Sequence, residues 1–244
     1  MMRRHLRWGA AALLVVLLAG CGSDLGLPTP VTTQAAKTRD LWRIFVVLAI
    51  IIGLIVYGLI IFVVVRYRRR RHADDEENPS QRQYHVPIEV VYTAIPIVIV
   101  GVLLGLSIRT ERDVTSTSAP ADLTVKVVGF QWQWQFSYDG TPVVVTGVPG
   151  KPPVLVLPTA RTVRLELSSP DVVHSFWVPH FIEKRDLIPR VDNAIQVRVD
   201  QPGQWDGVCS EFCGLDHTTM RFSVQAVPGP QFDAWLASGG TTSP

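Results

Sequence analysis

Two long apolar runs stand out in the first half of the chain. The run from Trp42 to Val65 carries no charged residue after Arg43, and a second run covers about residues 86–108. A helix of about 20 apolar residues is long enough to cross a hydrocarbon core of roughly 30 Å. The pattern therefore predicts a transmembrane helical hairpin over residues 41–110, with helices at about 42–65 and 86–108.

The second half changes to short Val-rich segments that partly alternate between apolar and polar residues. Turn residues such as Asp139-Gly140 and Pro149-Gly150 separate them. Many short strands at this spacing are typical of an antiparallel sandwich or barrel, so we expect residues 111–244 to form an all-β domain. The expected strands are residues 123–128, 131–138, 142–146, 162–168, 194–199 and 220–227, and residues 230–238 suit a short closing helix.

The first 20 residues have the layout of a secretory signal peptide. A basic start precedes the apolar run of residues 10–19. The tetrapeptide Leu18-Ala19-Gly20-Cys21 then resembles the lipobox of bacterial lipoproteins, in which the cysteine becomes the lipidated N-terminus. The alternative is an uncleaved signal with an incidental Cys21. Residues 1–20 are thus predicted as a signal peptide and residues 21–40 as an extracytoplasmic tether.

The formal net charge of +2 hides a strong asymmetry along the chain. The basic cluster Arg66–Arg71 follows the first helix and indicates its cytoplasmic end, so the N-terminus and the all-β domain are expected outside the cytoplasm. From Glu111 onward 10 Lys/Arg residues face 14 Asp/Glu residues. An acidic outer domain argues against nucleic acid and is compatible with a basic protein partner.

Candidate metal ligands gather in the segment from Cys209 to Met220, which also holds Cys213 and His217, while His174 lies 35 residues upstream of Cys209. Thiolate, imidazole and thioether are soft ligands that favour copper over magnesium, calcium or manganese. A closed zinc site of two Cys and two His is the competing interpretation, although it leaves Met220 unexplained. Three cysteines in all are too few for a disulfide framework.

The segment C-S-E-F-C-G-L-D-H-T-T-M resembles the dinuclear copper A loop of the cytochrome c oxidase subunit II family. The resemblance implies a cupredoxin-like Greek-key sandwich or barrel after the helical hairpin. It also implies that two sulfurs bridge both coppers and that each imidazole binds one copper. The thioether would be an axial ligand on the copper of His174, and a backbone carbonyl the corresponding ligand on the other copper. The implied metal ligands are His174, Cys209, Glu211, Cys213, His217 and Met220.

A second resemblance concerns the aromatic stretch Gly129–Trp134, which is similar to a G-x-Q-W-x-W strand of the same family. It implies that Trp132 is the point where electrons enter from a cytochrome c; the alternative is a packed core tryptophan. Ser137 occupies a position that is often acidic in members that meet soluble cytochrome c, with Asp139 and Asp171 as possible substitutes. We therefore expect an only modestly acidic docking surface, suited to a membrane-bound cytochrome c.

Further matches concern the partner subunit. Residues Lys184–Pro189 resemble the K-x-D-x-I-P segment that contacts subunit I, although Arg190 replaces the usual glycine. The stretch Glu89–Pro96 resembles an E-x2-W/Y-T-x2-P pattern that places Glu89 at the mouth of a proton pathway; the alternative is a water-exposed interfacial glutamate. The side chain of Glu211 is implied to reach a magnesium or manganese ion shared with subunit I.

Together these resemblances imply subunit II of a cytochrome c oxidase, a proton-translocating oxidoreductase whose oxygen-reducing site lies in subunit I. The expected partners are subunit I, other oxidase subunits, a soluble or membrane-bound cytochrome c, and lipid of the bacterial cell membrane, which the chain crosses twice. A quinol oxidase subunit without copper and a copper chaperone or free-standing copper lipoprotein are the alternatives. The intact set of ligands argues against the first, and the two helices with Glu89 against the second.

Overall fold

A computed structural model describes residues 25–68 and 83–241 of the chain. The predicted signal peptide and Cys21 lie outside the described residues. The chain divides into two compact units, one of residues 40–111 and one of residues 112–244 together with the chain up to Arg39, as far as each is described. We describe each unit separately.

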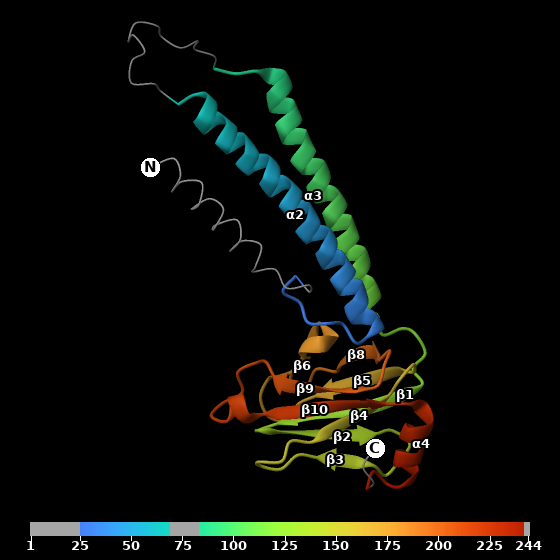
Figure 1. Cartoon of the computed structure of the whole chain (residues 1–244). Coiled ribbons are helices and arrows are strands. Elements are labelled where there is room, and N and C mark those ends of the chain that lie inside the picture. The colour runs from blue at the N-terminus through green and yellow to red at the C-terminus, as the bar shows by residue number, and fades with distance from the viewer. Residues whose placement is uncertain (1–24, 69–82, 242–244) are drawn as a thin grey trace, which may run out of the picture. The chain divides into compact units, whose positions relative to one another are not determined.

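Two apolar helices make up the first unit. Helix α2 spans Thr33–Arg66 and helix α3 spans Val86–Thr115 (Figure 1). Both are long and apolar enough to cross a membrane. Pro96 lies inside α3, which transmembrane helices tolerate better than soluble ones. The prediction of two apolar helices is confirmed.

Both helices are longer than their apolar runs. Helix α2 begins at Thr33 rather than near residue 42, because the Thr32 hydroxyl accepts a hydrogen bond from the Ala35 amide (3.0 Å) and caps the helix there. Residues 33–40, predicted as tether, are therefore helical. Helix α3 continues past residue 108 to Thr115, since the polar residues that follow the apolar run are compatible with a helix outside the hydrocarbon.

The second unit is a sandwich of two five-stranded sheets (Figure 1). One sheet has the order β3-β2-β1-β5-β8 and the other β4-β10-β9-β6-β7. Each sheet contains one parallel pair, β1 with β5 and β10 with β4, among antiparallel pairs. The strands are Leu123–Phe130 (β1), Gln133–Tyr138 (β2), Val144–Thr146 (β3), Val154–Pro158 (β4), Thr162–Ser168 (β5), His174–Val178 (β6), Glu183–Leu187 (β7), Asn193–Arg198 (β8), Gly203–Cys209 (β9) and Arg221–Val227 (β10).

The all-β prediction is confirmed, with changes in detail. Strand β2 begins at Gln133 rather than at residue 131, because Gln131 and Trp132 form a turn. Strands β4, β6, β7 and β9 were not among the predicted segments. The predicted closing helix is present as α4, Gly229–Ala237.

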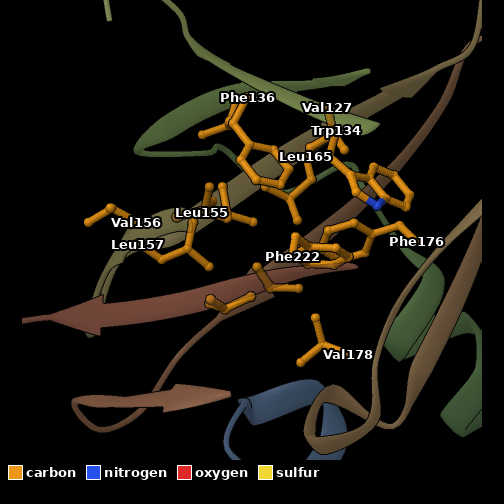
Figure 2. Close-up of a cluster of buried hydrophobic side chains, with 14 of the residues drawn as sticks. Val127, Trp134, Phe136, Leu155, Val156, Leu157, Leu165, Phe176, Val178 and Phe222 are labelled. Atoms are coloured by element: carbon orange, nitrogen blue, oxygen red, sulfur yellow. The ribbon is translucent and has the colours of Figure 1, made fainter. Parts of the chain in front are cut away.

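The sandwich interior is filled by aromatic and aliphatic side chains from both sheets. Figure 2 shows Trp134 of β2 beside Phe176 of β6, with Phe222 of β10 between the layers. The rings of Phe176 and Phe222 stack at 4.8 Å between centroids, and Trp134 meets Phe222 edge-on at 5.1 Å. These side chains are fully or almost fully buried, so they pack β6 and the start of β10 against β2.

The residues that lead into α2, together with its first turn, pack on the sandwich. We call residues 29–36 the strap. Val31 exchanges backbone hydrogen bonds with His180 and Asp200, and Thr32 forms a β-bridge with Val199. Val31, Thr32 and Ala35 are buried. His180, for which the sequence offered no role, also contacts the Thr29 carbonyl through Nδ1 at 2.9 Å.

Candidate metal centre

The loop between β9 and β10 carries most of the predicted ligands. It begins at Cys209, the last residue of β9, and ends at Met220, just before β10. The Cys209 amide donates to the Met220 carbonyl (3.0 Å), which closes the base of the loop. The Ser210 amide donates to the Ser175 carbonyl (3.1 Å), which ties the loop to β6 beside His174. The loop is thus held at both ends by the sheet that supplies the remaining histidine.

Six atoms that could bind a metal, from this loop and β6, form one continuous cluster. The two sulfurs of Cys209 and Cys213 lie 3.8 Å apart, too far for a disulfide, and both cysteines are free. His174 Nδ1 lies 3.9 Å from the Cys209 sulfur, and His217 Nδ1 lies 3.5 Å from the Cys213 sulfur. The remaining two distances are Met220 Sδ to Cys213 Sγ, 3.8 Å, and the Glu211 carbonyl oxygen to Cys209 Sγ, 3.3 Å.

The cluster has two ends that share the sulfurs. The ligand atoms of His174, Cys209 and Cys213 all lie within 4.8 Å of one another, and all three residues are buried. His217 lies outside this trio and contacts it through the Cys213 sulfur. One imidazole thus contacts each thiol, so the cluster offers soft nitrogen and sulfur ligands at both ends.

The acid–base state of the cluster also fits a cation. Burial opposes ionisation of Cys209, but contact with the His174 imidazole outweighs it, and the pKa of this thiol is lowered. Burial, together with the charge of the neighbouring Cys209, raises the pKa of Cys213. A bound cation removes this conflict, because a metal-ligating thiol is deprotonated and the positive charge compensates both thiolates.

Trp132 lies next to the metal cluster. Its indole Nε1 donates a hydrogen bond to the Cys213 carbonyl at 3.1 Å, and the side chain is half-buried against the core. The Gln131 side-chain amide donates to the same carbonyl at 2.7 Å. The neighbouring core tryptophan, Trp134, is fully buried, and its ring lies 6.4 Å from that of His174. Of the two, Trp132 is the one with surface exposure.

Asp171 joins His174 to the turn that carries Trp132. One carboxylate oxygen lies 2.9 Å from His174 Nε2, and the other accepts the Gln131 amide at 2.8 Å. Burial raises the pKa of this carboxyl, but the hydrogen bonds from Gln131 and His174 outweigh it and hold the pKa below its usual value. The sequence suggested Asp171 only as an acidic docking residue, because its contact with Gln131 depends on the fold.

Glu211 occupies the outer side of the same loop. Its carboxylate forms an ion pair with Lys184, with 3.1 Å between Oε2 and Nζ. The same Nζ lies 3.7 Å from a carboxylate oxygen of Asp186. Both acids and the lysine are partly exposed. The K-x-D segment predicted as a subunit contact therefore lies beside the metal-ligand loop.

Glu89 lies in the first turn of α3, far in sequence from the residues of the metal cluster. Its carboxylate accepts the His85 amide at 2.8 Å and so caps the helix N-terminus. A carboxylate at this end also interacts favourably with the helix dipole. The capping contact accounts for an acidic residue here without a proton pathway, so that role stays a prediction.

Two apolar helices followed by a cupredoxin-like β-sandwich with a Cys-His cluster that could hold a metal define the class: a membrane-integral protein with a candidate metal site. Residues 21–109 match the family "Cytochrome C oxidase subunit II, transmembrane domain", and residues 152–227 match "Cytochrome C oxidase subunit II, periplasmic domain". The chain belongs to the cytochrome c oxidase subunit II family. It is therefore a membrane-integral subunit of a haem–copper oxidase, an oxidoreductase.

Individual relatives agree with this assignment. A probable cytochrome c oxidase subunit 2 of Streptomyces coelicolor is 36% identical over 97% of this chain and 86% of its own length. Cytochrome c oxidase subunit 2 of Mycobacterium bovis is 28% identical over 91% of this chain and 78% of its own length. Among solved structures, the periplasmic domain of subunit II of cytochrome oxidase from Bradyrhizobium japonicum is 29% identical, covers 50% of this chain and 96% of that chain, and has a TM-score of 0.46.

Proposed function

We propose that this chain accepts electrons from a cytochrome c at a dinuclear copper A centre and passes them to haem in subunit I. There they would reduce oxygen to water, coupled to proton translocation. The observation that carries the proposal is the cluster of six donors in which two thiols, 3.8 Å apart, have one imidazole at each end.

The proposed ligands have distinct roles. Bound copper would supply one-electron transfer between cytochrome c and haem. Cys209 and Cys213 would hold both ions as bridging thiolates, and His174 and His217 would each present Nδ1 to one ion. Met220 Sδ and the Glu211 carbonyl complete the set as weak ligands, as the family resemblance implies. The loop is closed by its own Cys209–Met220 hydrogen bond and is hydrogen-bonded to β6, so little would have to move during electron transfer.

Trp132 is proposed as the point where electrons enter. Its indole is partly exposed and is hydrogen-bonded to the carbonyl of Cys213, a proposed copper ligand. A short covalent and hydrogen-bonded route thus connects the protein surface with a bridging sulfur. The fully buried Trp134 has no exposed surface that a donor could meet.

The remaining assignments follow the family pattern. The Lys184–Pro189 segment would face subunit I, and Glu211 would share a magnesium or manganese ion with that subunit in exchange for its present ion pair with Lys184. Glu89 would stand at the mouth of a proton pathway. Cys21 would carry lipid, and the N-terminus and the sandwich would lie outside the cytoplasm, with the basic loop after Arg66 inside.

A structural zinc site is the second candidate, and the Met220 thioether is the observation against it. Its sulfur lies 3.8 Å from the Cys213 sulfur and is buried. Structural zinc takes four Cys, His or carboxylate ligands and has no use for a thioether. Blue-copper sites, by contrast, use a weak axial methionine.

The test is metal loading of the full-length chain purified in detergent. We expect two coppers per chain, a purple colour and a seven-line hyperfine pattern in the EPR spectrum. Cys213→Ser should abolish that spectrum. Ser210→Ala is the matched control, because Ser210 lies in the same loop and its buried hydroxyl has no partner among the described residues. One bound zinc or a single copper per chain would overturn the proposal.

The donor surface can be tested in the assembled oxidase. Ser137 stands where family members that meet soluble cytochrome c often carry an acid, and the Asp171 carboxylate is held by internal hydrogen bonds, so we propose an only modestly acidic docking surface. We expect turnover with soluble cytochrome c to change only weakly between low and physiological ionic strength. Tight, strongly salt-dependent binding would contradict this, since it reports steering by many charges.

A further inference from the structure

We propose that Asp171 is a positioning residue that fixes His174 and the Trp132 turn to each other as one unit. This inference rests on the proposed function, because it assigns Asp171 a part in electron entry to the metal centre. Asp171 follows β5 and precedes β6, on the short connection that ends at His174. Its two carboxylate oxygens point to different parts of the site.

The first oxygen determines which nitrogen of His174 faces the metal cluster. It lies 2.9 Å from His174 Nε2, while Nδ1 of the same ring faces the Cys209 sulfur. An ionised carboxylate only accepts hydrogen bonds, so the ring proton stays on Nε2 and the Nδ1 lone pair is left for a metal. A carboxylate behind a ligating histidine also makes the imidazole a stronger donor.

The second oxygen holds the turn that carries Trp132. It accepts the Gln131 amide at 2.8 Å, and the Gln131 side chain in turn donates to the Cys213 carbonyl, where the Trp132 indole also donates. Trp132 is therefore connected to His174 through Asp171 and to Cys213 directly. Movement of the turn relative to the cluster would break several hydrogen bonds at once.

This arrangement makes the two histidines inequivalent. The His174 side chain is fully buried and has Asp171 behind it. His217 is partly exposed, and its ring meets Phe212 edge-on at 5.8 Å. Within residues 25–68 and 83–241, no carboxylate hydrogen-bonds to His217. The stronger imidazole donor is thus on the His174 side, which is also the side connected to the Trp132 turn.

A first experiment needs no copper. In the metal-free full-length chain in detergent, ¹⁵N NMR at alkaline pH reports the tautomer of each labelled histidine. We expect His174 to be the Nε2–H tautomer in the wild type and a mixture of tautomers in Asp171→Asn. Asp206→Asn is the control, since Asp206 is an exposed acid on β9 and its replacement changes the net charge equally. A wild-type mixture, or an unchanged tautomer in Asp171→Asn, would overturn the proposal.

A second experiment uses the copper-loaded chain. In Asp171→Asn we expect two coppers to remain bound, altered hyperfine splittings, and a several-fold change in the one-electron reduction equilibrium towards the reduced form, up to about tenfold, or about 59 mV. Electron uptake from reduced cytochrome c should slow several-fold, and Asp206→Asn should match the wild type. Equal effects of both variants would reduce Asp171 to a general charge effect and contradict the proposal.

The two experiments separate failure of this inference from failure of the proposed function. If the centre does not hold copper, the wild-type chain will not show the copper spectrum, and the proposed function fails. The tautomer of His174 in the metal-free chain still tests whether Asp171 positions that ring. If Asp171→Asn loses copper, Ser169→Ala serves as a milder variant. The Ser169 hydroxyl lies 3.1 Å from the Asp171 carboxylate and accepts the Asp171 amide at 3.3 Å, so its loss loosens the position of Asp171 and should move the potential in the same direction by a smaller factor. An unchanged potential in Ser169→Ala together with an unchanged tautomer in Asp171→Asn would contradict the proposal.

Discussion

At the residue scale, Gly214 lies beside the Trp132 ring, next to the Cys213 carbonyl that accepts the indole hydrogen bond. Its φ of +117° is a conformation that residues with a side chain rarely adopt. A Cβ there would lie 3.2 Å from the Trp132 ring and 3.1 Å from the Gln131 amide nitrogen. The absence of a side chain at Gly214 therefore allows the Gln131 amide and the Trp132 indole to reach the Cys213 carbonyl.

Replacing Gly214 with alanine should damage both stability and the site. We expect Gly214→Ala to destabilise the sandwich by about 1–3 kcal/mol, as backbone strain of this kind costs, and to weaken metal binding. Urea unfolding and copper content of the purified chain measure the two effects. Gly150→Ala is the control, because Gly150 also has positive φ, +77°, but an added Cβ would meet nothing within 4 Å. If both variants lose copper equally, the contact with Trp132 is not the cause.

The sequence indicated the candidate ligand residues, which the structure brings together, but it did not indicate the contacts around them. Cys209, Cys213, His217 and Met220 lie close together in the chain, so their spacing alone indicated a metal loop. The contacts of Asp171 depend on a turn 40 residues away meeting the connection before β6. Such a contact is set by strand register, and the pattern of apolar positions carries no information on it.

At the scale of elements, the strands that the sequence missed are the ones with weak apolar alternation. Strand β7 has the sequence Glu-Lys-Arg-Asp-Leu, and β9 contains two glycines and an aspartate. Both lie beside β6, which holds His174. Pairing with neighbouring strands stabilises them despite their low intrinsic strand propensity. The two strands beside β6 are therefore the ones whose composition is least strand-like.

Tyr138 connects the two sheets through an edge strand. Its buried hydroxyl donates to the Val156 carbonyl (2.9 Å) and accepts the Val156 amide (2.8 Å), so β2 of one sheet holds β4 of the other. Burial raises the pKa of the hydroxyl, which stays a donor at any working pH. The contact satisfies the free backbone groups of Val156 on the side away from β10.

Tyr138→Phe should lower the free energy of unfolding by about 1–3 kcal/mol, because two buried backbone groups lose their partner. Chemical denaturation of the full-length chain measures the change. The spectrum of the metal centre should stay as in the wild type. Tyr84→Phe, at an exposed tyrosine, should have no effect on stability. A neutral Tyr138→Phe would mean that Val156 finds other partners.

Helix α4 is attached by a two-pronged ion pair. The two terminal guanidinium nitrogens of Arg161 each donate to one carboxylate oxygen of Asp233 at 2.7 Å. The hydrogen bond from Arg161 lowers the pKa of Asp233. The side chains are 37% and 54% exposed, so solvent screens the pair. We expect a coupling of about 0.5–1 kcal/mol from a double-mutant cycle of Arg161→Gln and Asp233→Asn.

This coupling should depend on pH in a defined direction. Because the folded-state pKa of Asp233 is depressed, the stabilisation is fully present above the unfolded value of about 3.9 and is lost as the pH falls through the folded value. Unfolding measured at neutral pH and in acid, at low and high salt, tests this. A coupling that persists in acid would show that packing of α4, not the charge of Asp233, is responsible.

At the scale of the whole molecule, the strap is the feature that links the start of the chain to the sandwich. Residues 29–36 lie against the end of β8, an edge strand, where Arg198 donates its amide to the Gln34 side chain and Thr33 donates to Asp200 at 2.9 Å. The sequence predicted an extracytoplasmic tether over residues 21–40, a stretch that contains Pro, Thr and Gly. Burial of Val31 and Ala35 outweighs that composition.

The strap should therefore contribute to the stability of the sandwich. A soluble fragment of residues 112–244 lacks it and exposes the apolar surface that Val31 and Ala35 cover, so we expect the fragment to unfold at a lower temperature once the strap site is empty. A peptide of residues 25–39 should raise the unfolding temperature as its concentration increases, because binding to the folded state alone shifts the equilibrium.

The matched control is the same peptide with Val31→Asp. A charge at this 4%-exposed position would be buried without a partner, so the variant peptide should not stabilise the fragment. If both peptides raise the unfolding temperature equally, the effect is a general one of added peptide. If neither does, the strap contacts contribute little on their own, and the sandwich is stabilised by its two sheets without help from the start of the chain.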